Sequence, residues 1–223
     1  MRQFIGWKIL ACAGLLAAGQ LFAAIKVACV GDSITAGSGL QNPREDAYPA
    51  QLGKKLGAEY EVRNFGVSGR TLLNHGDYPF TKEPAFRDAL AWQPDIVVIA
   101  LGTNDGKPQN YEQFPKEFAP DYQELIKAFR DANSAVKIYV CTPPPVWPPG
   151  AFRINGDIVA KRVAPLVRQV AREEEVELID LQTALRGKGK YFPDKVHPNP
   201  EGAGLMAGVV AKALTGQDSA GTE

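Results

Sequence analysis

The sequence of 223 residues lacks several features that mark common protein classes. It has no excess charge, because 25 Lys and Arg residues balance 25 Asp and Glu residues. Nucleic acids and anionic membrane surfaces attract clustered positive charge, so the composition predicts neither as a partner. With two histidines and three cysteines, the chain also offers few ligands for a catalytic zinc ion. We therefore expect no metal and no other cofactor.

Motifs of several enzyme classes are missing as well. No Gly-x-Ser-x-Gly surrounds any of the five serines, so the nucleophile elbow of the α/β-hydrolases is not present. Gly37-Ser38-Gly39 lacks the third glycine of a dinucleotide-binding fingerprint, and there is no Walker loop for phosphate. The chain shows no internal repeat and no linker. With 45% apolar and 22% charged residues, its composition is that of one globular domain.

The first 24 residues differ from the rest. Arg2 and Lys8 precede the apolar stretch from Ile9 to Ala24, and the segment contains no acid. This pattern predicts a signal peptide at residues 1–24 and a secreted or periplasmic protein. The alternative is a permanent membrane anchor, but the stretch is shorter than the roughly 20 residues that span a bilayer. We therefore expect its removal and no stable membrane insertion afterwards. Ile9-Leu10-Ala11-Cys12 resembles a lipobox, which leaves lipid anchoring open.

Removal of this segment would leave 23 basic and 25 acidic residues, a net charge of −2. It would also leave two cysteines, Cys29 and Cys141, each within or at the end of an apolar run. Such positions favour buried free thiols, although export would allow a disulfide between them. We expect the folded domain to cover residues 25–215 and a flexible polar tail to cover residues 216–223. The oligomeric state is open.

Five β-rich apolar runs alternate with longer amphipathic segments in this domain. The predicted strands are Ile25–Val30, Glu61–Asn64, Asp95–Leu101, Val136–Cys141 and Val176–Leu181. The predicted helices are Tyr48–Leu56, Pro84–Ala91, Tyr111–Arg130, Gly156–Glu175 and Pro200–Leu214. Repeated strand-then-helix order indicates a parallel sheet with helices on both faces, a three-layer α/β/α domain. Its ligand site should lie at the carboxyl ends of the strands.

Chemically informative side chains follow the predicted strands. The four segments are Gly31-Asp32-Ser33-Ile34-Thr35, Phe65-Gly66-Val67-Ser68-Gly69, Gly102-Thr103-Asn104-Asp105 and Asp194-Lys195-Val196-His197. The fold therefore brings a serine, a glycine, an asparagine and an Asp/His pair to one edge of the sheet. These are the parts of an acyl-transfer site.

A serine hydroxyl is a poor nucleophile at neutral pH unless an adjacent base accepts its proton. His197 follows Asp194 by three positions, close enough for the carboxylate to accept a hydrogen bond from one ring nitrogen. We expect Ser33 to be the nucleophile, His197 the general base and then acid, and Asp194 the group that orients the imidazole. The alternatives are a surface-loop histidine and a serine that caps a helix.

The four segments, in this order, resemble the SGNH hydrolase family, also called the GDSL family. The first segment departs slightly from the family pattern, because it contains Gly-Asp-Ser-Ile-Thr in place of Gly-Asp-Ser-Leu. The resemblance implies a flavodoxin-like five-stranded sheet and ester hydrolysis without a metal. It also implies an oxyanion hole formed by the backbone N–H groups of Ser33 and Gly66 and the side-chain amide of Asn104.

The substrate is less constrained by the sequence. The segment Thr142–Pro149 is stiffened by prolines and carries Trp147, a candidate platform for a sugar ring together with three further aromatics, Tyr78, Phe80 and Phe192. The alternative is that these aromatics belong to the core. Arg70 and Arg153 could meet the carboxylate of an acidic sugar, unless both are simply solvated.

The local sequences Tyr48-Pro49-Ala50-Gln51-Leu52 and Asn64–Thr71 resemble those of exported bacterial carbohydrate and sialate O-acetylesterases. This resemblance favours an enzyme that removes acetyl groups from a glycan or a sialic acid. A lysophospholipase or thioesterase of the same fold is the first alternative, and it would prefer longer acyl groups. An inactive glycan-binding module is the second, although the intact serine, histidine and aspartate argue against it.

Overall fold

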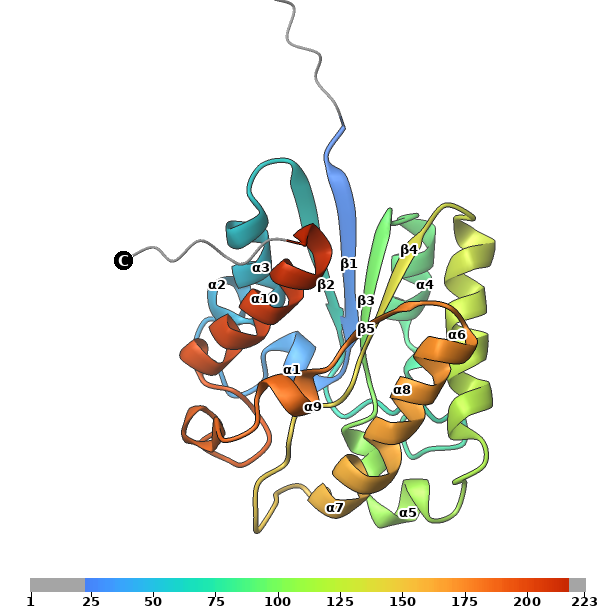
Figure 1. The fold of residues 1–223 in the computed structure, drawn as a ribbon, viewed down its shortest axis with the longest axis vertical. Helices are drawn as coiled ribbons and strands as arrows, with labels where there is room; N and C mark the ends of the chain where they lie inside the picture. The colour runs from blue at the N-terminus through green and yellow to red at the C-terminus, as the bar shows by residue number, and fades with distance from the viewer. Residues whose placement is uncertain (1–22, 217–223) are drawn as a thin grey trace, which may run out of the picture.

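A computed structural model describes residues 23–216 as a three-layer α/β/α domain (Figure 1). The predicted signal peptide and the predicted tail fall almost entirely outside these residues. One parallel sheet contains β1 (Ile25–Gly31), β2 (Tyr60–Gly66), β3 (Ile96–Ala100), β4 (Lys137–Cys141) and β5 (Glu177–Ile179). The strand order is β2-β1-β3-β4-β5, which is the flavodoxin-like order. The predicted fold class is confirmed.

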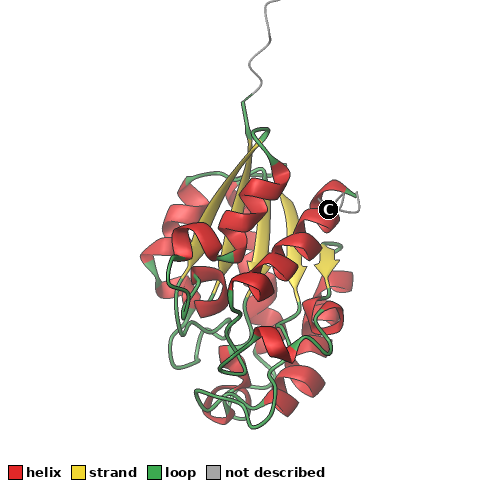
Figure 2. Cartoon of the chain, turned by 90° about the vertical axis from the view of Figure 1, so that its left-hand side faces the viewer, coloured by secondary structure: helices red, strands yellow, loops and turns green. Residues whose placement is uncertain are grey.

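Five longer helices cover the two faces of the sheet (Figure 1 and Figure 2). One face packs against α3 (Tyr48–Leu56) and α10 (Pro200–Thr215). The other face packs against α4 (Pro84–Ala91), α6 (Phe118–Ala132) and α8 (Ala164–Glu173). The shorter segments are α1 (Ser33–Ala36), α2 (Pro43–Asp46), α5 (Pro108–Tyr111), α7 (Gly156–Ile158), α9 (Leu181–Ala184), η1 (Phe80–Lys82), η2 (Asn104–Gly106), the π turn η3 (Val159–Val163) and η4 (Gly189–Tyr191).

The sheet separates two hydrophobic cores, and β1 contributes side chains to both. Val27 and Cys29 belong to the core under α3 and α10, whereas Ala28 and Val30 belong to the opposite core. All four side chains are fully buried. A sheet covered on both faces buries both sides of each central strand, which explains why the apolar runs in the sequence are continuous rather than alternating.

Two helices in the structure differ from the continuous helices that the sequence predicted. The predicted helix over residues 111–130 is interrupted, because α5 ends at Tyr111 and α6 begins at Phe118. Pro115 lies in the gap, where its ring would clash with the Tyr111 carbonyl of a continuous helix. The predicted helix over residues 156–175 contains the π turn η3, which ends shortly before Pro165, a residue without an N–H to donate.

Both cysteines in the described part of the chain are buried free thiols, as the sequence predicted. Burial raises the pKa of the Cys29 thiol to about 12, so this group stays protonated and unreactive at neutral pH. Within residues 23–216, no helix has the length and apolar character needed to cross a bilayer.

Candidate active site

Ser33 is the first residue of α1 and directly follows the Asp32 cap at the carboxyl end of β1. The Asp32 side chain caps this short helix, because its Oδ1 accepts a hydrogen bond from the Ile34 N–H at 2.9 Å. The helix ends at Gly37, which has a left-handed φ of 84°. Ser33 is 9% exposed, so the residue is almost completely buried at this edge of the sheet.

A continuous chain of hydrogen bonds joins Ser33 to an imidazole and a carboxylate. The Nε2 of His197 lies 2.8 Å from the Oγ of Ser33. The Nδ1 of the same ring lies 2.7 Å from the Oδ2 of Asp194. The structure therefore brings together the three residues that the sequence predicted as a triad, although 164 positions separate the serine from the histidine.

The loop that carries the histidine is fixed by Asp194. The Oδ1 of this carboxylate accepts the backbone N–H of Val196 at 2.9 Å and that of His197 at 2.6 Å. Partial burial opposes ionisation of Asp194, but these hydrogen bonds and the His197 ring outweigh it and hold the pKa of Asp194 below its usual value. The carboxylate is therefore charged at neutral pH and can stabilise an imidazolium.

The second histidine does not belong to this site. His75 has a side chain that is 70% exposed, and its Nδ1 lies 2.7 Å from the Oε2 of Glu117. No other histidine occurs in the sequence. His197 is thus the one imidazole that can serve Ser33 as a base.

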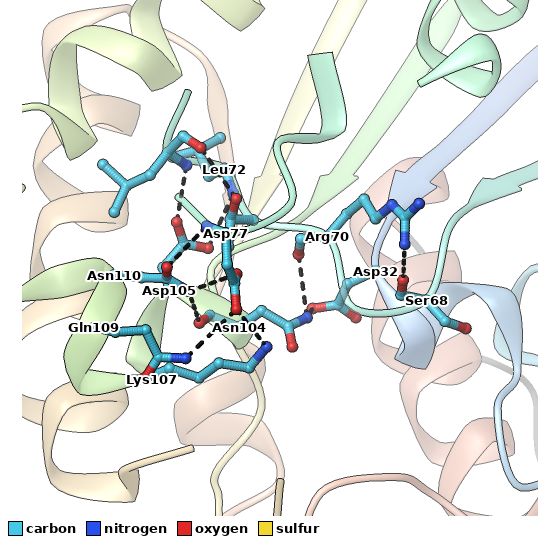
Figure 3. A network of polar contacts seen from close by, with 12 residues as sticks. Asp32, Ser68, Arg70, Leu72, Asp77, Asn104, Asp105, Lys107, Gln109 and Asn110 are labelled. Atoms are coloured by element: carbon cyan, nitrogen blue, oxygen red, sulfur yellow. Dashed lines mark hydrogen bonds and ion pairs between the residues drawn. The ribbon is translucent and has the colours of Figure 1, made fainter. Parts of the chain in front are cut away.

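Asn104 lies at the start of η2, after β3, and its side-chain amide points toward the serine loop (Figure 3). Its Nδ2 donates to the Arg70 carbonyl at 3.1 Å and makes a longer contact of 3.4 Å with the Oδ2 of Asp32. The backbone carbonyl of Asn104 accepts a hydrogen bond from the Asn110 side chain at 3.0 Å. The amide is therefore held between the loop after β1 and the loop after β2.

Asp105, the residue after Asn104, binds the loop that follows β2 (Figure 3). Its two carboxyl oxygens accept the backbone N–H groups of Leu72 and Leu73 at 2.9 and 2.8 Å. Burial raises the pKa of Asp105 to about 7 and that of Asp32 to about 6, against an ordinary value of 3.8. Two buried carboxyls thus support the polar edge of the site.

These raised pKa values predict a pH-dependent stability. Between about pH 4 and about pH 7 the folded protein binds protons at Asp105 that the unfolded chain has lost, so this carboxyl contributes less to the free energy of unfolding as the pH rises. We expect wild type to lose stability relative to Asp105→Asn across that window, and the difference to level off above it. Urea unfolding from pH 4 to pH 8 measures this. A difference that is constant with pH would mean that Asp105 is ionised throughout.

Gly66, the predicted oxyanion donor, has a different role in the structure. Its N–H donates to the Oδ1 of Asn64 at 2.9 Å and is therefore already used. A Cβ at this position would lie 2.4 Å from the backbone N of Ala36, so glycine is needed for β2 to pack closely against α1. This hydrogen bond and this packing argue against the role that the family resemblance implied for Gly66.

Gly69, three residues later, differs from Gly66 in its backbone N–H and in the space around it. Its N–H has no hydrogen-bond acceptor among residues 23–216, and its φ of 82° is left-handed. A Cβ on Gly69 would meet nothing within 4 Å, so this backbone faces open space. It directly precedes Arg70, whose carbonyl accepts a hydrogen bond from the Asn104 side-chain amide. The sequence offered this signal, because Gly69 closes the same segment as Gly66.

The two glycines should respond differently to alanine. Gly66→Ala forces a backbone shift at α1, so we expect its free energy of unfolding to fall by about 1–3 kcal/mol or more. Gly69→Ala adds only the strain of a left-handed backbone, about 1–2 kcal/mol, with no clash. Denaturant unfolding of both variants compares them. Equal stability of Gly66→Ala and wild type would contradict the packing role.

Arg70 was predicted to bind substrate, but its guanidinium is engaged within the protein. It forms an ion pair with the Oε1 of Glu83 at 2.9 Å and donates to the Ser68 carbonyl at 2.7 Å. The group also lies over the Tyr78 ring, 5.6 Å from its centroid. These contacts neutralise and orient the side chain, which argues against a carboxylate-binding role.

Trp147 was also predicted to bind substrate, and it is likewise engaged. Its ring packs on Phe192 with centroids 4.5 Å apart, and a Cβ at Gly189 would lie 2.8 Å from its Nε1. Its backbone N–H donates to the Lys195 carbonyl at 3.1 Å. Trp147 therefore fastens the proline-rich segment to the loop that carries His197.

The remaining aromatic candidates divide into core and surface. Phe80 and Phe192 are fully buried, so the core alternative holds for them. Tyr78 is 57% exposed, and so is Phe152, a residue that the sequence analysis did not single out. The Phe152 ring lies edge-on against His197, with centroids 5.1 Å apart. Its isolated position in a Gly-Ala-Phe-Arg loop gave no periodic or motif signal.

A three-layer α/β domain with a serine, a histidine and an aspartate joined at its carboxyl edge has the arrangement of a serine-dependent hydrolase. The chain belongs to the GDSL-like Lipase/Acylhydrolase family, whose profile matches residues 29–205. It is 42% identical over 209 residues to an acetylxylan esterase of Xylanibacter ruminicola, a match that covers 86% of this chain and 43% of that protein. The chain thus spans less than half the length of that relative.

Two further comparisons give one more relative and one solved structure. An arylesterase of Vibrio mimicus is 29% identical over 195 residues, covering 85% of this chain and 88% of the relative. Among solved structures, a carbohydrate acetylesterase from Sinorhizobium meliloti superposes with a TM-score of 0.71 at 24% identity, covering 86% of this chain and 99% of that one. This structural likeness supports the fold.

Proposed function

We propose that this protein is a serine esterase in which Ser33 is the nucleophile, His197 the general base and acid, and Asp194 the orienting carboxylate. The observation that carries the proposal is the unbroken chain from the Ser33 hydroxyl through the imidazole to the carboxylate, with contacts of 2.8 and 2.7 Å. Nucleophile and base lie within hydrogen-bond distance, and a third group orients the base.

The reaction follows from this arrangement. As the Oγ of Ser33 attacks the ester carbonyl, the Nε2 of His197 accepts its proton, and Asp194 stabilises the imidazolium. The imidazolium then gives that proton to the leaving alcohol, and the acyl group stays on the serine. A water molecule, deprotonated by the same nitrogen, attacks the acyl-enzyme and releases the acid and the free Ser33 hydroxyl.

The tetrahedral intermediates carry a negative oxygen that needs donors. We propose the backbone N–H groups of Ser33 and Gly69 and the side-chain amide of Asn104 for this role, with Gly69 in place of Gly66. The amide of Asn104 can turn one hydrogen from its long contact with Asp32 toward the oxyanion while it keeps the Arg70 carbonyl as partner. Hydrogen-bond donors directed at the developing negative charge stabilise the tetrahedral intermediate.

We further propose O-acetyl esters of carbohydrates as substrates. The acetylxylan esterase relative supports this choice, as do the exposed aromatic rings of Tyr78 and Phe152, which suit the apolar face of a sugar. Of the two candidates for the carboxylate of an acidic sugar, Arg70 is paired with Glu83, whereas Arg153 is exposed. Export, which residues 1–24 predict, fits a glycan outside the cell.

A series of p-nitrophenyl esters of increasing acyl length tests the proposal, followed by acetate release from acetylated xylan. We expect the highest kcat/KM on the acetyl ester and measurable acetate release from the polymer. Highest turnover on octanoate or longer esters would favour a lysophospholipase or thioesterase instead. Binding of xylan without hydrolysis of any ester would favour an inactive glycan-binding module.

A further inference from the structure

Phe152 is an exposed aromatic residue directly beside the proposed catalytic histidine. It lies in loop 142–155, between β4 and α7, and 57% of it is exposed. Its ring meets the His197 ring at 5.1 Å between centroids and an interplanar angle of 64°. A phenyl group in this position covers one side of the imidazole and still presents apolar surface to solvent.

The backbone at this position is strained. Phe152 and Arg153 have φ angles of 54° and 62°, in the left-handed region that bulky side chains rarely adopt. The loop is held there by hydrogen bonds from the Ile154 N–H to the Ala151 carbonyl and from the Asn155 N–H to the Gly106 carbonyl, both 2.9 Å. Because most of the ring is exposed, burial offsets little of this cost. Strain kept next to a catalytic group points to a functional contact.

The stereochemistry of the reaction decides which part of a substrate the ring meets. His197 must give its proton to the leaving alcohol, so the alcohol oxygen lies next to the Nε2 of this ring. The oxyanion lies on the side of Asn104, which contacts the serine loop rather than the histidine loop. A side chain packed on the imidazole therefore flanks the alcohol portion of the ester rather than its acyl portion.

A hollow of about 390 Å³ adjoins the same imidazole. Its lining includes His197 and Asp194 together with Leu40, Gln41 and Asp46. It thus offers an amide and a carboxylate, groups that hydrogen-bond hydroxyls, beside apolar surface. Phe152 and Ser33 are not among the lining residues, so His197 is the residue that the hollow shares with the Phe152 contact.

We propose that Phe152 is the apolar wall of a subsite for the leaving alcohol and that this subsite takes a sugar ring by its C–H face. The inference rests on the proposed function, which supplies the ester chemistry, and adds the residue that selects the alcohol. A phenyl ring has no polar atom, so it recognises a flat apolar face.

Two acetyl esters that differ only in the alcohol test this role: methyl acetate and a monoacetate of methyl xylopyranoside. For Phe152→Ala we expect kcat/KM on the sugar acetate to fall about 3- to 10-fold, mainly through KM, since one aromatic contact is lost. Methyl acetate is too small to reach the ring, so its kcat/KM should change less than twofold. Phe152→Trp should keep the preference for the sugar ester. Ile25→Ala, an exposed apolar residue at the opposite end of β1, is the matched control.

Phe152→Gly separates this role from folding. Glycine adopts a φ of 54° without strain, so the unfolding temperature should equal or exceed that of wild type, with the same sugar-selective loss. Equal losses on both esters would mean that Phe152 positions His197 and would overturn the subsite, as would no loss on either ester. Failure of the proposed function is visible in wild type alone, as no acetate released from the sugar ester, and it would overturn the subsite too.

Discussion

Ser33→Ala should lower kcat on acetyl esters by about 10⁴- to 10⁶-fold, because removing the nucleophile of a triad eliminates the acyl-enzyme route. The fold should persist, since the Asp32 cap of α1 and the strand before it are unchanged. Some rate above that of water should remain from binding and the oxyanion donors. Steady-state kinetics with purified variant, checked by circular dichroism, measure both expectations.

The matched control for this experiment is Ser134→Ala. Ser134 is an exposed serine in the turn before β4, at the opposite end of the sheet from the site. Its kcat should equal that of wild type. Substantial activity in Ser33→Ala together with an intact fold would exclude Ser33 as the nucleophile.

Asp194→Asn should lower kcat by about 10⁴-fold with little change in KM. The remaining oxygen can still accept the backbone N–H groups of Val196 and His197, so the loop should keep its shape. The new amide, however, donates a hydrogen bond to the Nδ1 of the ring, so the imidazole proton moves to Nε2. A protonated Nε2 faces Ser33 but cannot accept the proton of its hydroxyl. The lost negative charge also leaves the imidazolium without a partner.

Kinetics of Asp194→Asn and of Asp131→Asn test this expectation. Asp131 is an exposed carboxylate at the end of α6, paired with Lys127 and remote from the site, so its variant should be fully active. A loss of less than tenfold in Asp194→Asn would mean that the carboxylate only shapes the loop.

The sequence predicted the sheet well because a buried parallel strand needs a continuous apolar run. The run around Ile96–Ala100 has no other satisfactory environment, and its burial is nearly complete. The triad was predictable for a related reason. Parallel strands end at one edge, so residues that follow β1 and those in the loop before α10 were expected to meet there, and Ser33 and His197 do.

The loops were less predictable, because the partner of a loop side chain is set by tertiary contacts. Arg70 is paired with Glu83, 13 positions away, and nothing in the local sequence indicates that bond. The backbone N–H of Gly66 donates to Asn64, whereas that of Gly69 has no acceptor in the described part of the chain. The position of Phe152 was not predicted because its backbone is left-handed, a conformation that phenylalanine rarely adopts.

The 164 positions between Ser33 and His197 also set when the enzyme can first act. The nucleophile enters the chain in the first β-strand unit, but its base arrives in the last loop, just before α10 packs beside α3. A growing or partly refolded chain that holds Ser33 without that loop has a chemically inert hydroxyl. Ester hydrolysis therefore requires that the loop carrying His197 has folded against the first strand unit. Local unfolding of this loop and of α10 is enough to abolish the activity.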